Sequence, residues 1–144
     1  TVTTDQQAPL GFELTVPTVD SGDQVWIYTQ NTDAASLIAG TVVGRAAGSS
    51  EVKGILCPTS ETTSRVIGIA QHTIAANSFG FVLRKGVGSV LIDTGVSANA
   101  GLMCGNGTAG RADAGTALTS PTFGMSLAVI GTGEVGTCWI NCHG

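Results

Sequence analysis

The sequence predicts an all-β fold: a single small antiparallel barrel or sandwich of short strands, with an extended N-terminal arm. Three observations predict it. Glycine supplies 21 of the 144 residues, which indicates frequent turns. Apolar and polar residues alternate over short stretches, as half-buried strands require. The longest stretch without glycine or proline is residues 23–39, so at most two helical turns fit, between residues 33 and 39.

Length and charge exclude several classes of protein. A chain of 144 residues can bury about two-thirds of its unfolded surface in one domain. Charged residues make up 11% of the chain, against about 25% in an average domain, and the net charge is −4. Arg84-Lys85 is the only basic cluster, so we expect no direct nucleic acid partner and no membrane partner. So few charges are typical of a subunit that buries much of its surface against other subunits.

The densest apolar segment spans residues 65–92, and we expect the other strands to pack onto it. Within it, Phe79 and Phe81 follow a period-two pattern that predicts a strand. Gly86 and Gly88 then interrupt the run before it resumes, and glycine inside a strand marks a bulge or a bend. The segment therefore predicts a bent or paired β core.

The remaining strands are predicted on both sides of this segment. We expect residues 1–22 to form a mobile arm of about eight residues and the first strand, and residues 23–144 to form the β-rich domain. The first strand is indicated by alternating apolar residues: Leu10, Phe12, Leu14 and Val16. Further strands are predicted at residues 24–30, 41–43, 51–57, 101–104, 123–130 and 136–141. Asn106-Gly107 predicts a tight two-residue hairpin turn.

The cysteines form an even set that a secreted protein could pair: Cys57, Cys104, Cys138 and Cys142. Their irregular spacing and apolar neighbours favour four buried thiols in a reducing cytosol. A metal site built from Cys138, Cys142 and His143, completed by Cys57 or Cys104, is the alternative. On one strand, however, residues 138 and 142 would lie about 13 Å apart, too far to share an ion. We therefore expect reduced thiols, no metal and no cofactor.

One short motif is compatible with catalysis. An apolar run that ends in Asp93-Thr94-Gly95 is how retroviral-type aspartic proteases present their carboxylate, one per subunit of a dimer. The later Val129-Ile130-Gly131 resembles a second motif of those enzymes. Asp-Thr-Gly after a strand is also ordinary turn chemistry, so we expect Asp93 to be a turn residue and the chain to have no catalytic residue. His72 is expected to be a hydrogen-bonded structural histidine.

Three stretches carry a resemblance to a known family. They are RVIGIAQHTIAANSFGFVLRKGVGSVLID, TAGRADAG and FGMSLAVIGTGEVGTCWI. In the first of them, Gly68-Ile69-Ala70 precedes Gly80-Phe81-Val82 and Lys85-Gly86-Val87. This order of glycine and small residues resembles that of the small head decoration, or cement, proteins of tailed bacteriophages. The resemblance covers residues 65–144, and residues 1–64 match only loosely.

The resemblance implies a structural virion protein that binds and stabilises the outside of a bacteriophage capsid. It also implies the major capsid protein as partner, a homotrimer, synthesis in the host cytoplasm and a place on the capsid exterior. Two alternatives remain: an aspartic protease that uses Asp93, and a small β-rich binding module for carbohydrate or peptide. The residues themselves indicate Pro9, Leu10 and Phe12 as partner-binding candidates. The proline restricts the arm, and its apolar neighbours have no local partners in the sequence.

Overall fold

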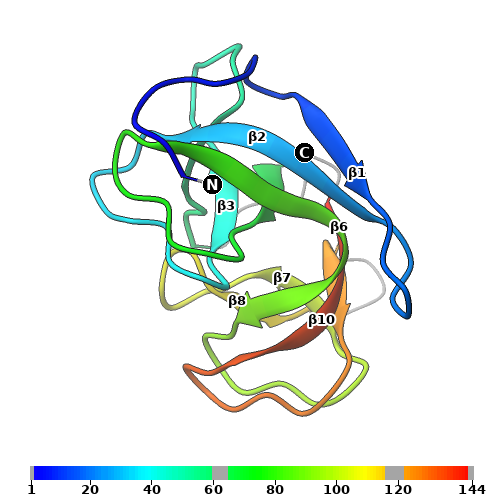
Figure 1. The fold of residues 1–144 in the computed structure, drawn as a ribbon. Coiled ribbons are helices and arrows are strands. Elements are labelled where there is room, and N and C mark those ends of the chain that lie inside the picture. Colours follow the sequence, from blue (N-terminus) through cyan, green and yellow to red (C-terminus); the bar gives the residue numbers. More distant parts are fainter. Residues whose placement is uncertain (1, 60–64, 116–121, 143–144) are drawn as a thin grey trace.

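The structure, a computed structural model, describes residues 2–59, 65–115 and 122–142. In these ranges ten strands form one sheet and no α-helix occurs (Figure 1). No described segment is a helix long and apolar enough to cross a membrane. The strands are β1 (Glu13–Val16), β2 (Gln24–Asn31), β3 (Val42–Arg45), β4 (Lys53–Leu56), β5 (Val66–Ile69), β6 (Phe79–Leu91), β7 (Gly101–Cys104), β8 (Ala112–Ala114), β9 (Gly124–Ser126) and β10 (Val135–Asn141).

Five of these strands close into a ring. Their order is β2, β4, β3, β5 and β6, and β6 returns to pair with β2. Every neighbouring pair is antiparallel except β2 and β4, which are parallel. β1 extends the ring as an antiparallel partner of β2. The predicted all-β fold with a small, mainly antiparallel barrel is therefore confirmed.

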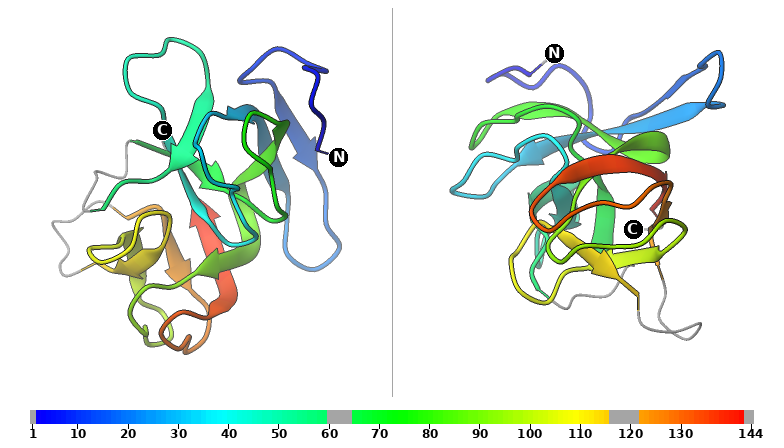
Figure 2. Two further views of the ribbon diagram at one scale, coloured as in Figure 1. Left: turned by 90° about the vertical axis from the view of Figure 1, so that its left-hand side faces the viewer. Right: turned by 90° about the horizontal axis from the view of Figure 1, so that it is seen from below.

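A second ring is built on the other half of β6. β10 pairs with β6, β9 with β10, β7 with β9, and β8 with β7. A parallel bridge between Ile92, which follows β6, and Ala112 of β8 returns to the starting strand. The blue-to-green strands of the first ring and the yellow-to-red strands of the second lie at opposite ends of the molecule (Figures 1 and 2). The sequence predicted one barrel; the structure has two rings that share a strand.

β6 is the shared strand. Its residues 79–85 pair with β2, and residues 85–91 pair with β10. Gly86 lies at this change of partner with a φ of 125°, which strains any residue other than glycine. A register shift in the β2–β6 pairing, beside Val25, marks a bulge at the same point. The central segment is thus the bent core strand that the sequence predicts.

The buried apolar side chains form two clusters. The smaller one belongs to the first ring: Ile27, Leu37, Val43, Ile67, Ala70, Ile74 and Val82. The larger one combines residues of both rings, among them Ile69 and Leu83 from the first and Phe123 and Ile140 from the second. Because one continuous core crosses the junction, the two rings pack as one unit.

One local structure recurs four times, at residues 37–40, 74–77, 96–99 and 130–133. Each copy begins with a buried apolar residue in an isolated antiparallel bridge, and the bridges join Leu37 to Ile74 and Val96 to Ile130. The fourth residue of each copy has a positive φ: Gly40, Asn77, Asn99 and Gly133. A strand begins two residues later in every case. We call these segments the bridge turns, and each ring contains one bridged pair.

Residues 33–39 do not form the predicted helical turns. The Asn31 side-chain amide donates to the carbonyls of Ala35 and Ile74, both at 2.9 Å. Leu37 exchanges two backbone hydrogen bonds with Ile74. These long-range partners satisfy the backbone groups that a helix would pair, so tertiary contacts override local helix propensity.

Three predicted boundaries also differ from the structure. β1 starts at Glu13 rather than Leu10, because the Phe12 amide donates to the Pro9 carbonyl in a turn. Residues 105–111, not Asn106-Gly107 alone, connect β7 to β8. β9 ends at Ser126 because a bridge turn follows it.

Candidate partner-binding surface

The N-terminal segment, residues 2–12, lies along the first ring. Thr3 and Phe79 exchange two backbone hydrogen bonds, of 3.1 and 2.8 Å. The Gln7 amide donates to the Tyr28 hydroxyl at 3.0 Å. The segment therefore has backbone and side-chain hydrogen-bond partners on β2 and β6.

Phe12 ends this segment, and its partners in the structure are distant in the sequence. Its ring lies edge-on to Phe81, with centroids 6.4 Å apart, and its carbonyl accepts the Tyr28 amide at 2.8 Å. Nevertheless 47% of Phe12 remains exposed. Of the other two candidates, Leu10 is half-buried and Pro9 is exposed in the preceding turn. Phe12 is thus the candidate best placed to meet a partner.

Exposed apolar side chains continue from Phe12 along the β1 hairpin. Leu14 and Val16 are 43% and 37% exposed, and Val19 in the hairpin loop is 97% exposed. Phe12, Leu14 and Val16 alternate along the strand, so they share one face. We call these four residues the hairpin patch. The period-two pattern in the sequence marked three of them as a strand face, but not as an exposed one.

A cavity of about 280 Å³ lies against the hairpin patch. It is lined by Leu14, Val16, Gln24, Trp26, His72 and Phe81. Its walls come from β1, β2, β6 and the loop after β5, so pairing of distant strands creates it. The patch and this cavity together form a concave apolar surface at the edge of the sheet, which is the form expected of a protein-binding surface.

His72 lies at the wall of this cavity without the hydrogen bond expected of it. Among the described residues its Nε2 atom is buried and has no hydrogen-bond partner. Burial lowers the pKa of His72 below its ordinary value, because the charged imidazolium is poorly solvated there. The prediction of a hydrogen-bonded structural histidine is therefore wrong for this atom.

We expect the folded protein to lose stability as the pH falls from about 7 to about 5. The pKa of His72 is lower in the folded chain than in the unfolded chain, so the unfolded chain takes up a proton first. The stability that neutral His72 gives the fold is fully present above the pKa of His72 in the unfolded chain. It is lost as the pH falls through the lower pKa of His72 in the folded chain. Thermal melting of wild type and His72→Gln measures this: the variant's melting temperature should change less over this interval. His143→Gln, at the chain's second histidine, is the matched control, and an equal effect of both variants would contradict the assignment.

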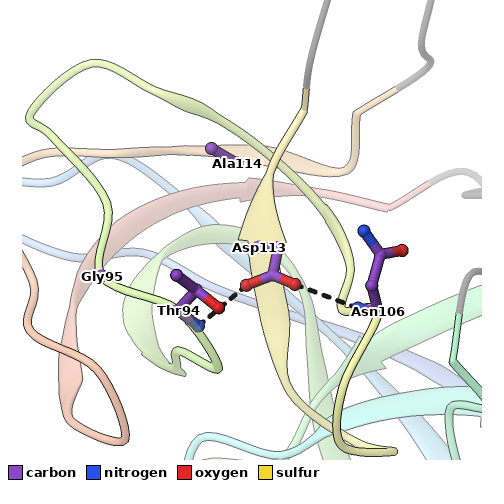
Figure 3. Close-up of a pocket in the computed structure, with 5 residues that line it drawn as sticks. All are labelled: Thr94, Gly95, Asn106, Asp113 and Ala114. Carbon is purple, nitrogen blue, oxygen red and sulfur yellow. Dashed lines mark hydrogen bonds between the residues drawn. The ribbon is translucent and has the colours of Figure 1, made fainter.

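Thr94 and Gly95 of the Asp-Thr-Gly motif line a second cavity, of about 250 Å³, together with Asn106, Asp113 and Ala114 (Figure 3). Asp113 accepts the amides of Thr94 and Asn106, at 2.8 and 3.0 Å. Asp93 accepts the amides of Gly107 and Thr108 through its Oδ2 atom, at 2.9 and 3.0 Å. Asp93 therefore holds the loop between β7 and β8, and Asp113 joins that loop to Thr94.

Two of the cysteines are deeply buried thiols of the second ring. Burial raises the pKa of Cys138 to about 11 and that of Cys142 to about 12. The alternative metal site also needs His143, which lies outside the described residues. No group of three potential metal ligands occurs in the described part of the chain.

Comparison with known proteins identifies a shared fold. No protein-family model matches the chain, and no curated protein has a matching sequence. Among solved structures, the chain is similar to the N base of head fiber gp8.5 in bacteriophage phi29, with a TM-score of 0.59 and 12% sequence identity. The match covers 81% of this chain and 94% of that chain. The chain therefore shares its fold with the N base of a bacteriophage head fiber.

Proposed function

We propose that this chain is a structural protein of a bacteriophage head that binds the outside of the capsid and stabilises it, as decoration or cement proteins do, without catalysis. The observation that carries the proposal is the fold shared with the N base of a head fiber, over nearly all of that domain. The resemblance of residues 65–144 to decoration proteins agrees with it. The proposed location is the capsid exterior, after synthesis in the host cytoplasm.

The hairpin patch is the proposed contact with the major capsid protein. Its apolar side chains are contiguous, whereas scattered single ones are normal on protein surfaces. The neighbouring charges, Arg84 and Glu13, neutralise each other in a 2.7 Å ion pair. An apolar surface of this kind, bordered by the exposed Asp20 and Asp23 of the hairpin loop, suits burial against a protein lattice.

Side-chain burial gives the size of the expected effect. Full burial of a leucine or valine side chain is worth about 1.5–3 kcal/mol. Leu14 and Val16 are 43% and 37% exposed, so each has roughly 1 kcal/mol left to contribute when covered. In the proposed homotrimer three such patches would act together, and multivalency would strengthen binding further.

Replacing Leu14 and Val16 together by threonine should weaken binding to assembled heads at least about tenfold. Threonine retains β propensity, so the strand should persist while its apolar surface is lost. Co-sedimentation with undecorated heads measures binding, and circular dichroism with thermal melting checks the fold.

The matched control replaces Leu127 and Val129 by threonine. These side chains are also exposed, at 43% and 79%, but lie in the second ring's turn before β10. The control variant should bind heads as well as wild type does.

Equal binding by wild type and the Leu14/Val16 variant would refute the hairpin patch as the contact. A wild-type chain that binds no heads would refute the proposed function. Deleting residues 1–12 is a poorer test, because that segment pairs with Phe79 and Tyr28.

A further inference from the structure

Two buried cysteines meet where the rings join. The sulfur atoms of Cys57 and Cys104 are 2.8 Å apart, and both residues are at most 1% exposed. A disulfide bond has an S–S distance of about 2.05 Å, so the two atoms are less than 1 Å from bonding distance. Cys57 directly follows β4 of the first ring, and Cys104 ends β7 of the second.

The backbone around both cysteines is held by one segment of the β7–β8 connection. The Gly110 amide donates to the Cys57 carbonyl at 2.8 Å, and the Cys57 amide donates to Val42 at 3.0 Å. Cys104 pairs with Ala112, two residues beyond Gly110. These bonds fix the two sulfurs relative to each other. The absence of a side chain at Gly44 leaves room beside Cys57, since a Cβ there would lie 3.3 Å from its sulfur.

We propose that Cys57 and Cys104 form a disulfide that crosslinks the two rings when the protein meets an oxidant of the small-molecule disulfide class. The thiolate of one cysteine attacks the reagent's S–S bond, forming a mixed disulfide and releasing one small thiol. The second thiolate then attacks the protein sulfur of the mixed disulfide and releases the other small thiol. The two protein thiols are oxidised, the reagent disulfide is reduced to two thiols, and the protein's two protons pass to the released thiolates.

The other cysteines compete poorly for this oxidation, because the fold holds the sulfur atoms of Cys57 and Cys104 in contact. Burial of Cys57 and Cys104 also has a consequence: the reaction is fast while the chain folds and slow once it has folded. A bond closed there is equally protected from reduction.

The crosslink would suit a protein that leaves a reducing cytoplasm as part of a particle. It joins residues 47 positions apart, one from each ring, and so restricts the unfolded chain. All four cysteines are thiols in the structure, as the sequence predicts; the proposed oxidation would leave two.

The test is refolding of the reduced, denatured full chain in a buffer of reduced and oxidised glutathione. Thiol titration after denaturation should find two thiols, and peptide mapping should join the peptides of Cys57 and Cys104. The melting temperature should rise by roughly 10 °C over that of the reduced protein. Four remaining thiols, or a different pairing in the peptide map, would overturn the proposal.

Two serine variants provide the controls. Cys57→Ser should retain three thiols and form no internal crosslink, whereas Cys138→Ser should still lose two thiols by joining Cys57 to Cys104. A crosslink that persists in Cys57→Ser would contradict the assignment. Because peptide mapping of wild type identifies the pair directly, the test does not depend on how well either variant folds.

Discussion

Gly124→Ala is expected to destabilise the protein by about 3 kcal/mol or more. A Cβ at position 124 would clash with the Trp139 carbonyl oxygen. This obstacle is backbone in the middle of the β9–β10 pair, where Trp139 faces Met125 and Ile140 faces Gly124. No side-chain rotation relieves such a clash, so the strands must move apart and lose hydrogen bonds and core packing.

Chemical denaturation of the variant and of Gly95→Ala measures this effect. The nearest atom to a Cβ at position 95 is the Ile130 carbonyl oxygen at 3.4 Å, an ordinary contact. Gly95→Ala should therefore stay within about 0.5 kcal/mol of wild type. If Gly124→Ala were as stable as Gly95→Ala, the close pairing of β9 with β10 would be wrong.

Leu83→Ala is expected to cost about 2–5 kcal/mol of unfolding free energy. Leu83 is fully buried and belongs to the cluster that spans both rings. It pairs with Trp26 and Ile69 in the first ring, and its side chain packs against Gly88 in the half of β6 that pairs with β10. Truncation leaves a cavity at the junction, which surrounding backbone cannot easily fill.

Denaturant unfolding followed by two probes measures the Leu83→Ala effect: intrinsic fluorescence of Trp26 in the first ring and Trp139 in the second. Both signals should shift together, since the core is shared. Leu14→Ala is the matched control, because Leu14 is 43% exposed and its truncation should cost less than about 1 kcal/mol. Separate transitions for the two tryptophans would show that the rings unfold independently, against expectation.

The strands were predictable wherever period two was visible over several residues. β2 and β10 lie within one residue of their predicted bounds, and the strand pattern at Phe79 and Phe81 falls in the bent β6. Ring closure was not predictable, because it depends on which distant strands pair. The β2–β6 pairing and the Ile92–Ala112 bridge join residues whose sequence gives no sign of register.

The four bridge turns share a short sequence pattern. Each has an apolar residue followed three positions later by glycine or asparagine, the residues that best tolerate positive φ. In the sequence alone, these glycines and asparagines only mark the ends of strands, and residues 33–39 suggest a helix. Only the pairing of Leu37 with Ile74, and of Val96 with Ile130, reveals a repeated unit.

The candidate surface was predictable in part. Phe12 follows from the alternating N-terminal apolar residues, and Leu14 and Val16 extend the same face. Their exposure was not predictable, since period two describes a buried face as well as an exposed one. The cavity beside them also needs Trp26, Phe81 and His72, which meet only when β1, β2 and β6 pair.

The sharing of β6 also sets an order in which the chain can fold as it leaves the ribosome. Every member of the smaller core cluster lies between Ile27 and Val82, so the first ring can collapse once the first half of β6 has emerged. The larger cluster needs Ile140 and Cys142, which emerge later. Until then the second half of β6 presents an unpaired edge, and Lys85, an exposed charge at its start, is the type of residue that discourages pairing with other chains. During translation the first ring can therefore fold first, and β6, the last strand of that ring, then pairs with the strands of the second ring.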